Sequence, residues 1–445
     1  MLDLAEKAVR LALELGASGA ECTIAEGDEF SANVRMRQLE TLKEAGSRGA
    51  GLRVLLGKRA GSSYTSDLSA DGIRSMVRSA IEIAGIGTED PYAGLPDPAD
   101  SGKLEGDLGL YCADVAKLET QFKIDQALAA EEAALSADAR ITNSEGGSFD
   151  SHTSARYFAN SQGFAGWYRK SSCSLSVAPV AQQGDSMERD YWFTVARGGA
   201  GLESPGMVGR KAAERALRRL GARKAVTQKA PVVFEPRVAR SLLANLFEAV
   251  DGEQVYRKAS FLEGRLGERV ASENVTIVND GTLPGGFGTS PFDDEGVTSR
   301  RTVVVDRGVL TSYLLNSYTA RKLGMKSTGS AARGITGNAQ VGPDNLYMEK
   351  GAKTPEEIVR SIGRGLYVTE LIGTGVNIVT GDYSRGAVGL WIENGEIAYP
   401  VSEITIAANL AHMLMEIEAV GDDLEFRGST ACPTLMIREM TISGQ

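Results

Sequence analysis

Apolar residues recur along the chain with two different periods, which separate helical from extended segments. Residues 4–15 and 238–250 carry them at the three-to-four spacing of an amphipathic helix, and Ser69 is placed to cap a third such run. Helical spacing also covers 117–135 and 206–220. Strand-like patterns, several with alternating apolar and polar residues, occupy 20–25, 30–36, 140–145, 154–159, 164–177 and 190–196. Long strands with a few helices between them predict an α+β fold, with helices on one face of an antiparallel sheet.

The pattern changes near Ala230, where a strand opens a second region. After the helix at 238–250 the apolar segments are short, and turn residues separate them. Asn394-Gly395 lies between two of these segments, and Asn-Gly is a strong signal for a two-residue hairpin. We therefore predict two domains: an N-terminal domain of helices and antiparallel sheet over residues 1–225, and a mostly antiparallel β domain over residues 226–445.

The charge balance argues against nucleic acid as a partner. The 445 residues include 48 Lys and Arg and 58 Asp and Glu, which gives a formal net charge of −10. Such a chain repels phosphate overall, whereas nucleic-acid binding needs a basic face. One basic run falls in the predicted helix at 206–220 and just beyond it, and we expect it to be a solvated helix face. It comprises Arg210, Lys211, Arg215, Arg218, Arg219, Arg223 and Lys224.

Cysteine spacing and hydropathy bear on where the chain works. Its four cysteines contain no C-x-x-C pair, and scattered cysteines are typical of proteins in a reducing cytosol. No stretch of 18 apolar residues occurs, and the first residues are charged where a signal peptide is apolar. We expect a cytoplasmic chain that has no membrane span.

Motifs for the common catalytic classes are missing from the sequence. It has no Walker phosphate loop, no G-x-S-x-G elbow and no H-E-x-x-H. Its only histidines are His152, expected in a surface turn, and His412, expected to be a hydrogen-bonded structural residue. The run Asp-Asp-Glu-Gly at 293–296 is interpreted as an exposed turn rather than a cation loop, because consecutive side chains diverge. A hydrolase with Cys173 or Ser384 as its nucleophile stays open as an alternative.

Several segments together resemble the TldD/PmbA family, and the resemblance covers essentially the whole chain. The most distinctive are 373–386 (GTGVNIVTGDYSRG) and 391–401 (WIENGEIAYPV), which follow one another near the C-terminus. Further matching segments are 37–40, 49–54, 293–296 and 433–435. The combination is specific to the family, although each segment alone is short.

The resemblance places a degenerate metal site in residues 246–252. TldD-type chains resemble zinc peptidases that carry H-E-x-x-x-H on a helix, where the histidines bind the metal and the glutamate polarises the attacking water. The match here is anchored on Glu248-Ala249-Val250 and on the downstream Arg257-Lys258. Phe247 takes the place of the first histidine and Gly252 that of the last, so only Glu248 is retained.

These replacements decide the branch of the family that the chain resembles. Phenylalanine and glycine side chains offer no lone pair to Zn²⁺, and a single carboxylate cannot hold the ion against water. The family's thiolate ligand lies well ahead of the Pro-Thr-Leu, whereas Cys432 is adjacent to it and is expected to be a buried structural thiol. The resemblance therefore points to the PmbA/TldE branch, with no catalytic residue, no metal ligand and no cofactor of its own.

The resemblance implies a pseudoenzyme that is inactive alone and completes a peptidase with a TldD-type zinc subunit. Such pairs cleave unfolded or modified peptides, of the microcin-leader or antitoxin type, and this chain would form part of the proteolytic cavity. An exposed sheet edge could hold varied peptides by adding them as a strand. A homodimer is the default for the isolated chain. The family's older label implies an alternative: a protein-interaction module of the gyrase-modulator type, without hydrolytic activity.

Overall fold

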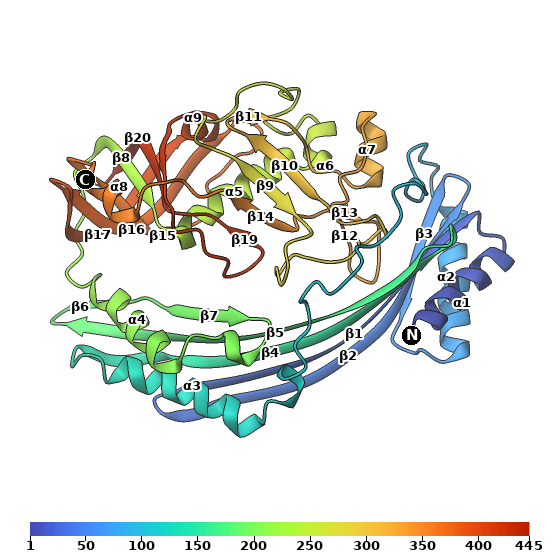
Figure 1. Ribbon diagram of the computed structural model, residues 1–445, viewed down its shortest axis with the longest axis horizontal. Helices are drawn as coiled ribbons and strands as arrows, with labels where there is room; N and C mark the ends of the chain where they lie inside the picture. The colour runs from blue at the N-terminus through green and yellow to red at the C-terminus, as the bar shows by residue number, and fades with distance from the viewer. Residues whose placement is uncertain (445) are drawn as a thin grey trace.

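A long antiparallel sheet forms most of the N-terminal half of the molecule. The computed structural model describes residues 1–444. The strands pair in the order β3-β2-β1-β4-β5-β6, with β7 also paired to β5, and Figure 1 shows the sheet as a strongly curved layer. Its strands are β1 (Gly19–Arg35), β2 (Gln38–Leu56), β3 (Arg59–Thr65), β4 (Ile141–Asn160), β5 (Ala165–Gln183), β6 (Ser186–Arg189) and β7 (Trp192–Ala196). The 20 residues of β4 span about 65 Å at the usual rise, so the sheet reaches across the whole molecule.

Two pairs of helices cover one face of this sheet near its two ends (Figure 1). They are α1 (Leu2–Glu14) with α2 (Ala70–Ile86), and α3 (Thr120–Leu135) with α4 (Pro205–Leu217). Ala20, Cys22 and Ile24 of β1 pack with α1 and α2. Farther along the same strand, Phe30 and Val34 join the apolar clusters of α3 and α4. Because alternate side chains of a strand share a face, both helix pairs lie on the same face, as the sequence pattern predicts.

The C-terminal half contains two further sheets. The larger has the order β17-β16-β15-β8-β20-β18, and the smaller has the order β11-β10-β9-β14-β19. The strands of the larger sheet are β8 (Gln228–Phe234), β15 (Arg364–Ile372), β16 (Asp382–Glu393), β17 (Glu396–Asn409), β18 (Ile417–Val420) and β20 (Leu435–Ser443). The other strands are β9 (Ile277–Asp280), β10 (Arg301–Asp306), β11 (Val309–Leu310), β14 (Asn345–Met348), β19 (Thr430–Ala431), and the small pair β12 (Ala331–Ala332) and β13 (Gln340–Val341). Only the pairs β8–β15 and β14–β19 are parallel among the paired strands of residues 1–444.

One helix, α5 (Pro236–Val250), forms the centre of the C-terminal core. Leu242, Leu243 and Leu246 on its apolar stripe belong to one buried cluster with Trp391 of the larger sheet and Ile277 of the smaller. The remaining helices are short: α6 (Gly252–Tyr256), α7 (Ser317–Leu323), α8 (Pro355–Arg360) and α9 (Leu410–Met415). The two sheets are therefore joined through α5, and α6 follows directly at its end.

Most of the predicted elements are confirmed, and the fold is α+β. Gly72 N donates to the Ser69 side chain, which caps α2 as expected. Asn394 and Gly395 have φ of 53° and 81°, the positive values that a type I′ hairpin turn requires. The predicted boundary between residues 225 and 226 falls between α4 and β8, and stays a prediction. Among the described residues, no helix combines the length and the apolar character needed to cross a bilayer.

The turn predicted for His152 and the structural role predicted for His412 are both wrong. His152 lies within β4, paired with Glu29 of β1 and Ser172 of β5, and is half-buried on the sheet. The polar residues before it belong to the long strand, because this part of the sheet is only partly covered. His412 is exposed on α9, where its neighbours Met413 and Leu414 take the buried positions.

Candidate functional site

The segment predicted to carry the degenerate metal site is not a continuous helix. α5 ends at Val250, and Asp251 adopts extended backbone angles before α6 begins at Gly252. The Asp251 carboxylate accepts a hydrogen bond of 2.8 Å from Glu253 N, which is the usual role of an N-cap aspartate. Gly252 N donates to Leu314 O at 2.9 Å and fixes the turn. Phe247 and Gly252 therefore lie on different helices, and the single helix expected at 246–252 is corrected.

Gly252 is buried beneath α7 and leaves no room for a side chain. A Cβ atom added there would lie 2.8 Å from Thr319 Oγ1, 2.9 Å from Thr319 Cβ, and still closer to a methyl group of Leu315. Real Cβ atoms essentially never come within 3.0 Å of another heavy atom, so the side chains of Thr319 and Leu315 would have to shift. Thr319 is itself held by the capping box of α7 with Asn316. An imidazole at position 252 would require α7 to move.

The other two predicted positions differ in burial. Phe247 is half-buried and packs against the core of the C-terminal half. Glu248 is exposed to solvent. Burial raises the pKa of the neighbouring Asp251 to about 6, and the charges of Glu253 and Glu248 add to the shift. Within residues 1–444, no three His, Cys, Asp or Glu side chains are grouped so that they could hold a metal ion.

A polar cavity of about 1060 Å³ lies beside α6, between the long sheet and the C-terminal half. Glu253 and Tyr256 of α6 line it, together with Arg53 of β2 and the segment 332–340. The cavity is within the size range of ligand sites. The predicted site residues Phe247, Glu248 and Gly252 do not line it; the nearest lining residue along the chain is Glu253, which directly follows Gly252.

The linker 88–107 and α7 form a further wall of this cavity. Tyr318 donates from its hydroxyl to the Asp90 carboxylate at 2.8 Å, and its ring meets that of Tyr256 edge-on. Arg321 donates to the carbonyl oxygens of Tyr92 and Leu95 at 2.7 and 3.0 Å. These residues could not be predicted from the sequence, because no local motif joins a helix to a linker that lies more than 220 residues away.

The acidic run at 293–296 is a turn, but it is not exposed. Asp293 and Glu295 are each only 5% exposed. Asp293 accepts hydrogen bonds of 2.9 Å from Glu295 N and Val297 N, which makes it an internal turn residue. Asp294 pairs with Arg156 of β4 at 3.0 Å. The expectation of an exposed turn is therefore wrong, because the long sheet covers this loop, which we call the acid loop.

Buried arginine pairs extend the acid loop into the long sheet. Glu21 of β1, 1% exposed, binds Arg333 closely and Arg53 at 3.0 Å. Burial by itself raises the pKa of Glu21, but the charges of Arg333 and Arg53 outweigh it and the net shift is downward. Burial raises the pKa of Glu295, and the nearby Glu21 charge adds to the shift. The arrangement stabilises the contact between the two halves of the chain.

The two alternative nucleophiles differ in their exposure. Cys173 is buried under the α3–α4 cluster, and burial raises the pKa of its thiol to about 11. A thiol of that pKa is inert at neutral pH. Ser384 is exposed on β16. Cys432 is 1% exposed, as predicted for a structural thiol, and burial raises its pKa well above the usual value.

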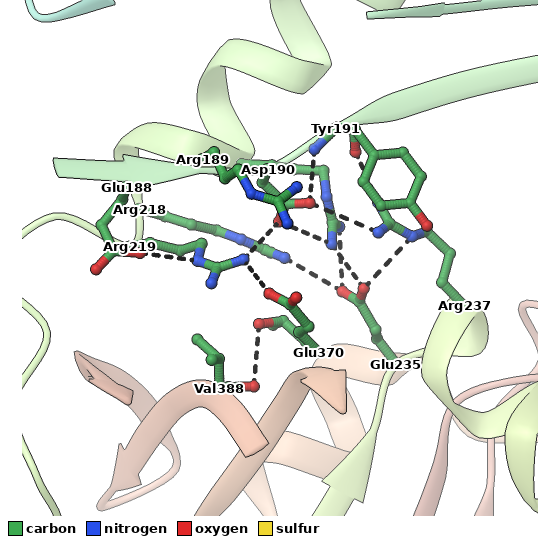
Figure 2. Close-up of polar contacts among 12 residues, drawn as sticks. Glu188, Arg189, Asp190, Tyr191, Arg218, Arg219, Glu235, Arg237, Glu370 and Val388 are labelled. Atoms are coloured by element: carbon green, nitrogen blue, oxygen red, sulfur yellow. Dashed lines mark hydrogen bonds and ion pairs between the residues drawn. The ribbon is translucent and has the colours of Figure 1, made fainter. Parts of the chain in front are cut away.

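The basic run after residue 210 is only partly the solvated helix face that was expected: Arg210, Lys211, Arg223 and Lys224 are exposed, whereas its middle arginines are not. Arg215 and Arg219 are 6% and 7% exposed, since they lie between α4 and the C-terminal half. Arg215 forms two hydrogen bonds with Glu235, at 2.7 and 3.1 Å, and Arg219 binds Glu370 at 2.6 Å. Figure 2 shows Glu370 of β15 beside Arg219, and Glu235, which follows β8, beside Arg218. The partners are distant in sequence or beyond the helix, so helical periodicity alone could not reveal them.

Comparison with known families accounts for nearly all of the chain. Residues 20–84 match domain 1 of the PmbA/TldA metallopeptidases, residues 113–220 match their central domain, and residues 227–444 match their C-terminal domain. The acid loop, α5 and α6 all lie in the part that matches the C-terminal domain.

Curated relatives and solved structures agree with these matches. The chain is 41% identical to Metalloprotease PmbA of Escherichia coli O157:H7, over 99% of this chain and 96% of the relative. It is 40% identical to the Metalloprotease PmbA homolog of Haemophilus influenzae, over 98% and 94%. A crystal structure from Bacteroides thetaiotaomicron, described as a candidate modulator of DNA gyrase, superposes with a TM-score of 0.92 at 30% identity, and 100% and 98% of the two chains are covered. TldE of Thermococcus kodakarensis shares the fold, with a TM-score of 0.90 at 20% identity over 99% and 100% of the two chains. The chain belongs to the PmbA/TldD family of metallopeptidases.

Proposed function

We propose that this chain is the metal-free partner subunit of a TldD/TldE-type metallopeptidase complex that degrades unfolded or modified peptides. The observation that carries the proposal is the packing at Gly252. The position that holds a histidine in TldD-type chains is closed here by Leu315 and Thr319, and its counterpart Phe247 packs against the core. The residues present do not fit a zinc ion, and we derive no catalytic step through one.

The cavity beside α6 supports a role in forming the peptide chamber. Its lining comes from both halves of the chain and from the linker, so the relative placement of the halves shapes it. A second subunit that covered this cavity would enclose a space that admits an extended peptide and excludes folded proteins. We infer that this chain contributes one wall of such a chamber and is a pseudoenzyme when alone.

The test is reconstitution with a TldD-type zinc subunit. The purified chain, the zinc subunit and their mixture are each incubated with an unfolded peptide that carries a fluorophore and a quencher. We expect cleavage to require the mixture, and the purified chain to contain zinc well below one ion per molecule by elemental analysis. Cleavage by this chain alone, or one tightly held zinc ion per chain, would contradict the proposal.

Substitutions at Gly252 test the structural reason for the missing site. Gly252→Ala should lower the free energy of unfolding by about 1–3 kcal/mol, because the added methyl group meets Thr319 and Leu315. Gly85→Ala is the matched control: it lies in α2 with no atom near its added Cβ, and it should be neutral or slightly stabilising. Phe247→His combined with Gly252→His should not take up stoichiometric zinc.

The gyrase-modulator alternative stays a prediction. Both proposals expect the chain to be inactive alone. They differ for the mixture with the zinc subunit, where only the peptidase-subunit proposal expects this chain to be required for peptide cleavage. Reconstitution without any peptide cleavage, together with binding to purified gyrase, would favour it over a peptidase subunit.

A further inference from the structure

A second pocket lies between the two halves of the chain, away from the cavity beside α6. It has a volume of about 300 Å³. It is lined by the end of β6, the residues after α4, the first turns of α5, and strands β15 and β16. The charged residues of its lining are Arg189, Asp190, Arg219, Arg237, Arg240, Glu370 and Arg385. We call it the arginine pocket, and Figure 2 shows the ion pairs along one side of it.

The carboxylates around the pocket are already occupied by arginines. Glu235 accepts from Arg215 and from Arg218, the latter at 3.2 Å. Asp190 lies 3.2 Å from Arg215. Glu370 binds Arg219. Each of these acids therefore forms an ion pair with a guanidinium group, although the buried Oδ2 of Asp190 accepts no hydrogen bond within the described residues.

Three arginines of the lining are left with weak or no compensation. Arg240 and Arg385 form no ion pair with any residue in 1–444, and Arg237 approaches Asp190 and Glu235 only at 3.5 and 3.9 Å. Burial lowers the pKa of Arg237, and the neighbouring charge of Arg215 adds to this shift. The pocket thus carries a local positive excess in a chain whose net charge is −10.

Unused hydrogen-bond donors accompany this excess. The buried Nε atoms of Arg237 and Arg385 and the buried hydroxyl of Ser241 have no hydrogen-bond partner within the part of the chain that the structure describes. Buried donors without a partner are costly, and a ligand or water normally satisfies them. All three residues line the pocket.

We propose that the arginine pocket binds a small polyvalent anion of the phosphate class. Guanidinium groups match phosphate oxygens in geometry and charge, and arginine cannot relieve a like-charge contact by losing its proton. A ligand with a single carboxylate can be bound by one guanidinium group through two hydrogen bonds, so it would not require several arginines. Here the unpaired arginines come from two elements, α5 and β16, and line one pocket, which favours an anion with several charged oxygens. The volume holds a phosphate or a pyrophosphate with bridging water.

The test is calorimetric titration of the full chain with inorganic phosphate and with pyrophosphate, at constant ionic strength set by chloride. We expect saturable binding, with pyrophosphate tighter than phosphate. Arg240→Gln combined with Arg385→Gln should weaken the affinity by about ten- to a hundredfold, the usual loss when charge-assisted hydrogen bonds are removed. Arg10→Gln combined with Arg74→Gln removes the same charge from exposed sites on α1 and α2, and should leave the affinity unchanged.

Each remaining outcome overturns the proposal. Absence of phosphate and pyrophosphate binding would do so, and so would equal binding by the pocket variant and the control variant. Tighter binding of a short peptide through its free C-terminal carboxylate would assign the pocket to peptide ends instead. Circular dichroism and the thermal midpoint show whether the pocket variant is folded, and the single change Arg240→Gln provides a milder version. None of these readouts depends on peptidase activity.

Discussion

Two charge clusters connect the long sheet to the C-terminal half, and they differ in which sign is in excess. The acid-loop cluster has four carboxylates against three arginines: Glu21, Asp293, Asp294 and Glu295 with Arg53, Arg156 and Arg333. The arginine cluster pairs four arginines with four carboxylates, Arg215, Arg218, Arg219 and Arg237 with Glu188, Asp190, Glu235 and Glu370. Arg240 and Arg385 then add unpaired positive charge beside it.

The two signs relieve a local excess in different ways. A crowded carboxylate can take up a proton, and the pKa of Asp293 is raised by its burial and by the charge of Glu295. A crowded arginine keeps its proton at any physiological pH. The acid-loop cluster can therefore neutralise itself, whereas the arginine cluster depends on its carboxylates and on any bound anion. This difference makes the loss of one acid more damaging in the arginine cluster.

The largest loss of stability is expected from Glu235→Gln. Glu235 is 4% exposed and holds Arg215 with two hydrogen bonds, so within residues 1–444 its removal leaves Arg218 without an ion pair and Asp190 as the only carboxylate paired with Arg215. Loss of one partner of a buried ion pair costs about 3–5 kcal/mol, measured as the free energy of unfolding in urea. The control is Glu439→Gln, whose exposed pair with Lys229 should contribute less than about 1 kcal/mol. Equal effects of the two changes would contradict the contrast between the clusters.

For Glu21→Gln we expect a smaller loss in the free energy of unfolding, of about 2–3 kcal/mol. Glu21 is as buried as Glu235 and also binds two arginines. Its charge, however, adds to the raised pKa of Glu295, so its removal lets Glu295 ionise more easily and compensate Arg333 in part. Urea unfolding of both variants side by side measures the difference. A loss as large as that of Glu235→Gln would show that the acid loop does not buffer its own charge.

The pH dependence of stability provides a third test, through Asp344. Burial raises the pKa of this carboxyl to about 7. The folded chain then holds the proton more tightly than the unfolded chain, whose aspartates titrate near pH 4. Its contribution is therefore fully present below about pH 4 and is lost as the pH rises toward 7. Between pH 5 and pH 7.5 we expect the wild type to lose about 2 kcal/mol relative to Asp344→Asn. If the free energies of unfolding of the two proteins changed equally with pH over this range, the result would contradict the raised pKa of Asp344.

Several of these features could be predicted from the sequence, because they depend on neighbours within one turn or one strand. The stripe of Leu242, Leu243 and Leu246 predicts α5, and Asn394-Gly395 predicts its hairpin. The polar half of β2 was missed: residues 38–46 are almost entirely exposed, so no face of this segment carries an apolar pattern. Backbone pairing with β1 alone makes this segment a strand.

The candidate site required knowledge of contacts between distant residues. The resemblance predicts that Gly252 takes the place of a histidine, but the closure of that position depends on Leu315 and Thr319, more than 60 residues later. In the same way, helical periodicity predicts that Arg219 is a solvated residue at the end of a helix. Its partner Glu370 lies 151 positions away in the sequence, so only the fold reveals the pair. Charge partners of this kind leave no periodic signal, because each is supplied by a different element of the fold.

The smallest loss of stability is expected when Asp294, on the more open side of the acid loop, is replaced by asparagine. Its pair with Arg156 is about one-fifth exposed on each side, at 3.0 Å, and water screens such pairs. Asp294→Asn keeps an oxygen that can accept from Arg333 N, which now lies 2.7 Å from the carboxylate. Because the loop already has surplus negative charge, the loss of this one should cost at most about 1 kcal/mol. A double-mutant cycle with Arg156→Gln isolates the pair, and a coupling energy above about 2 kcal/mol would mean that the acid loop depends on each of its charges as strongly as the arginine cluster does.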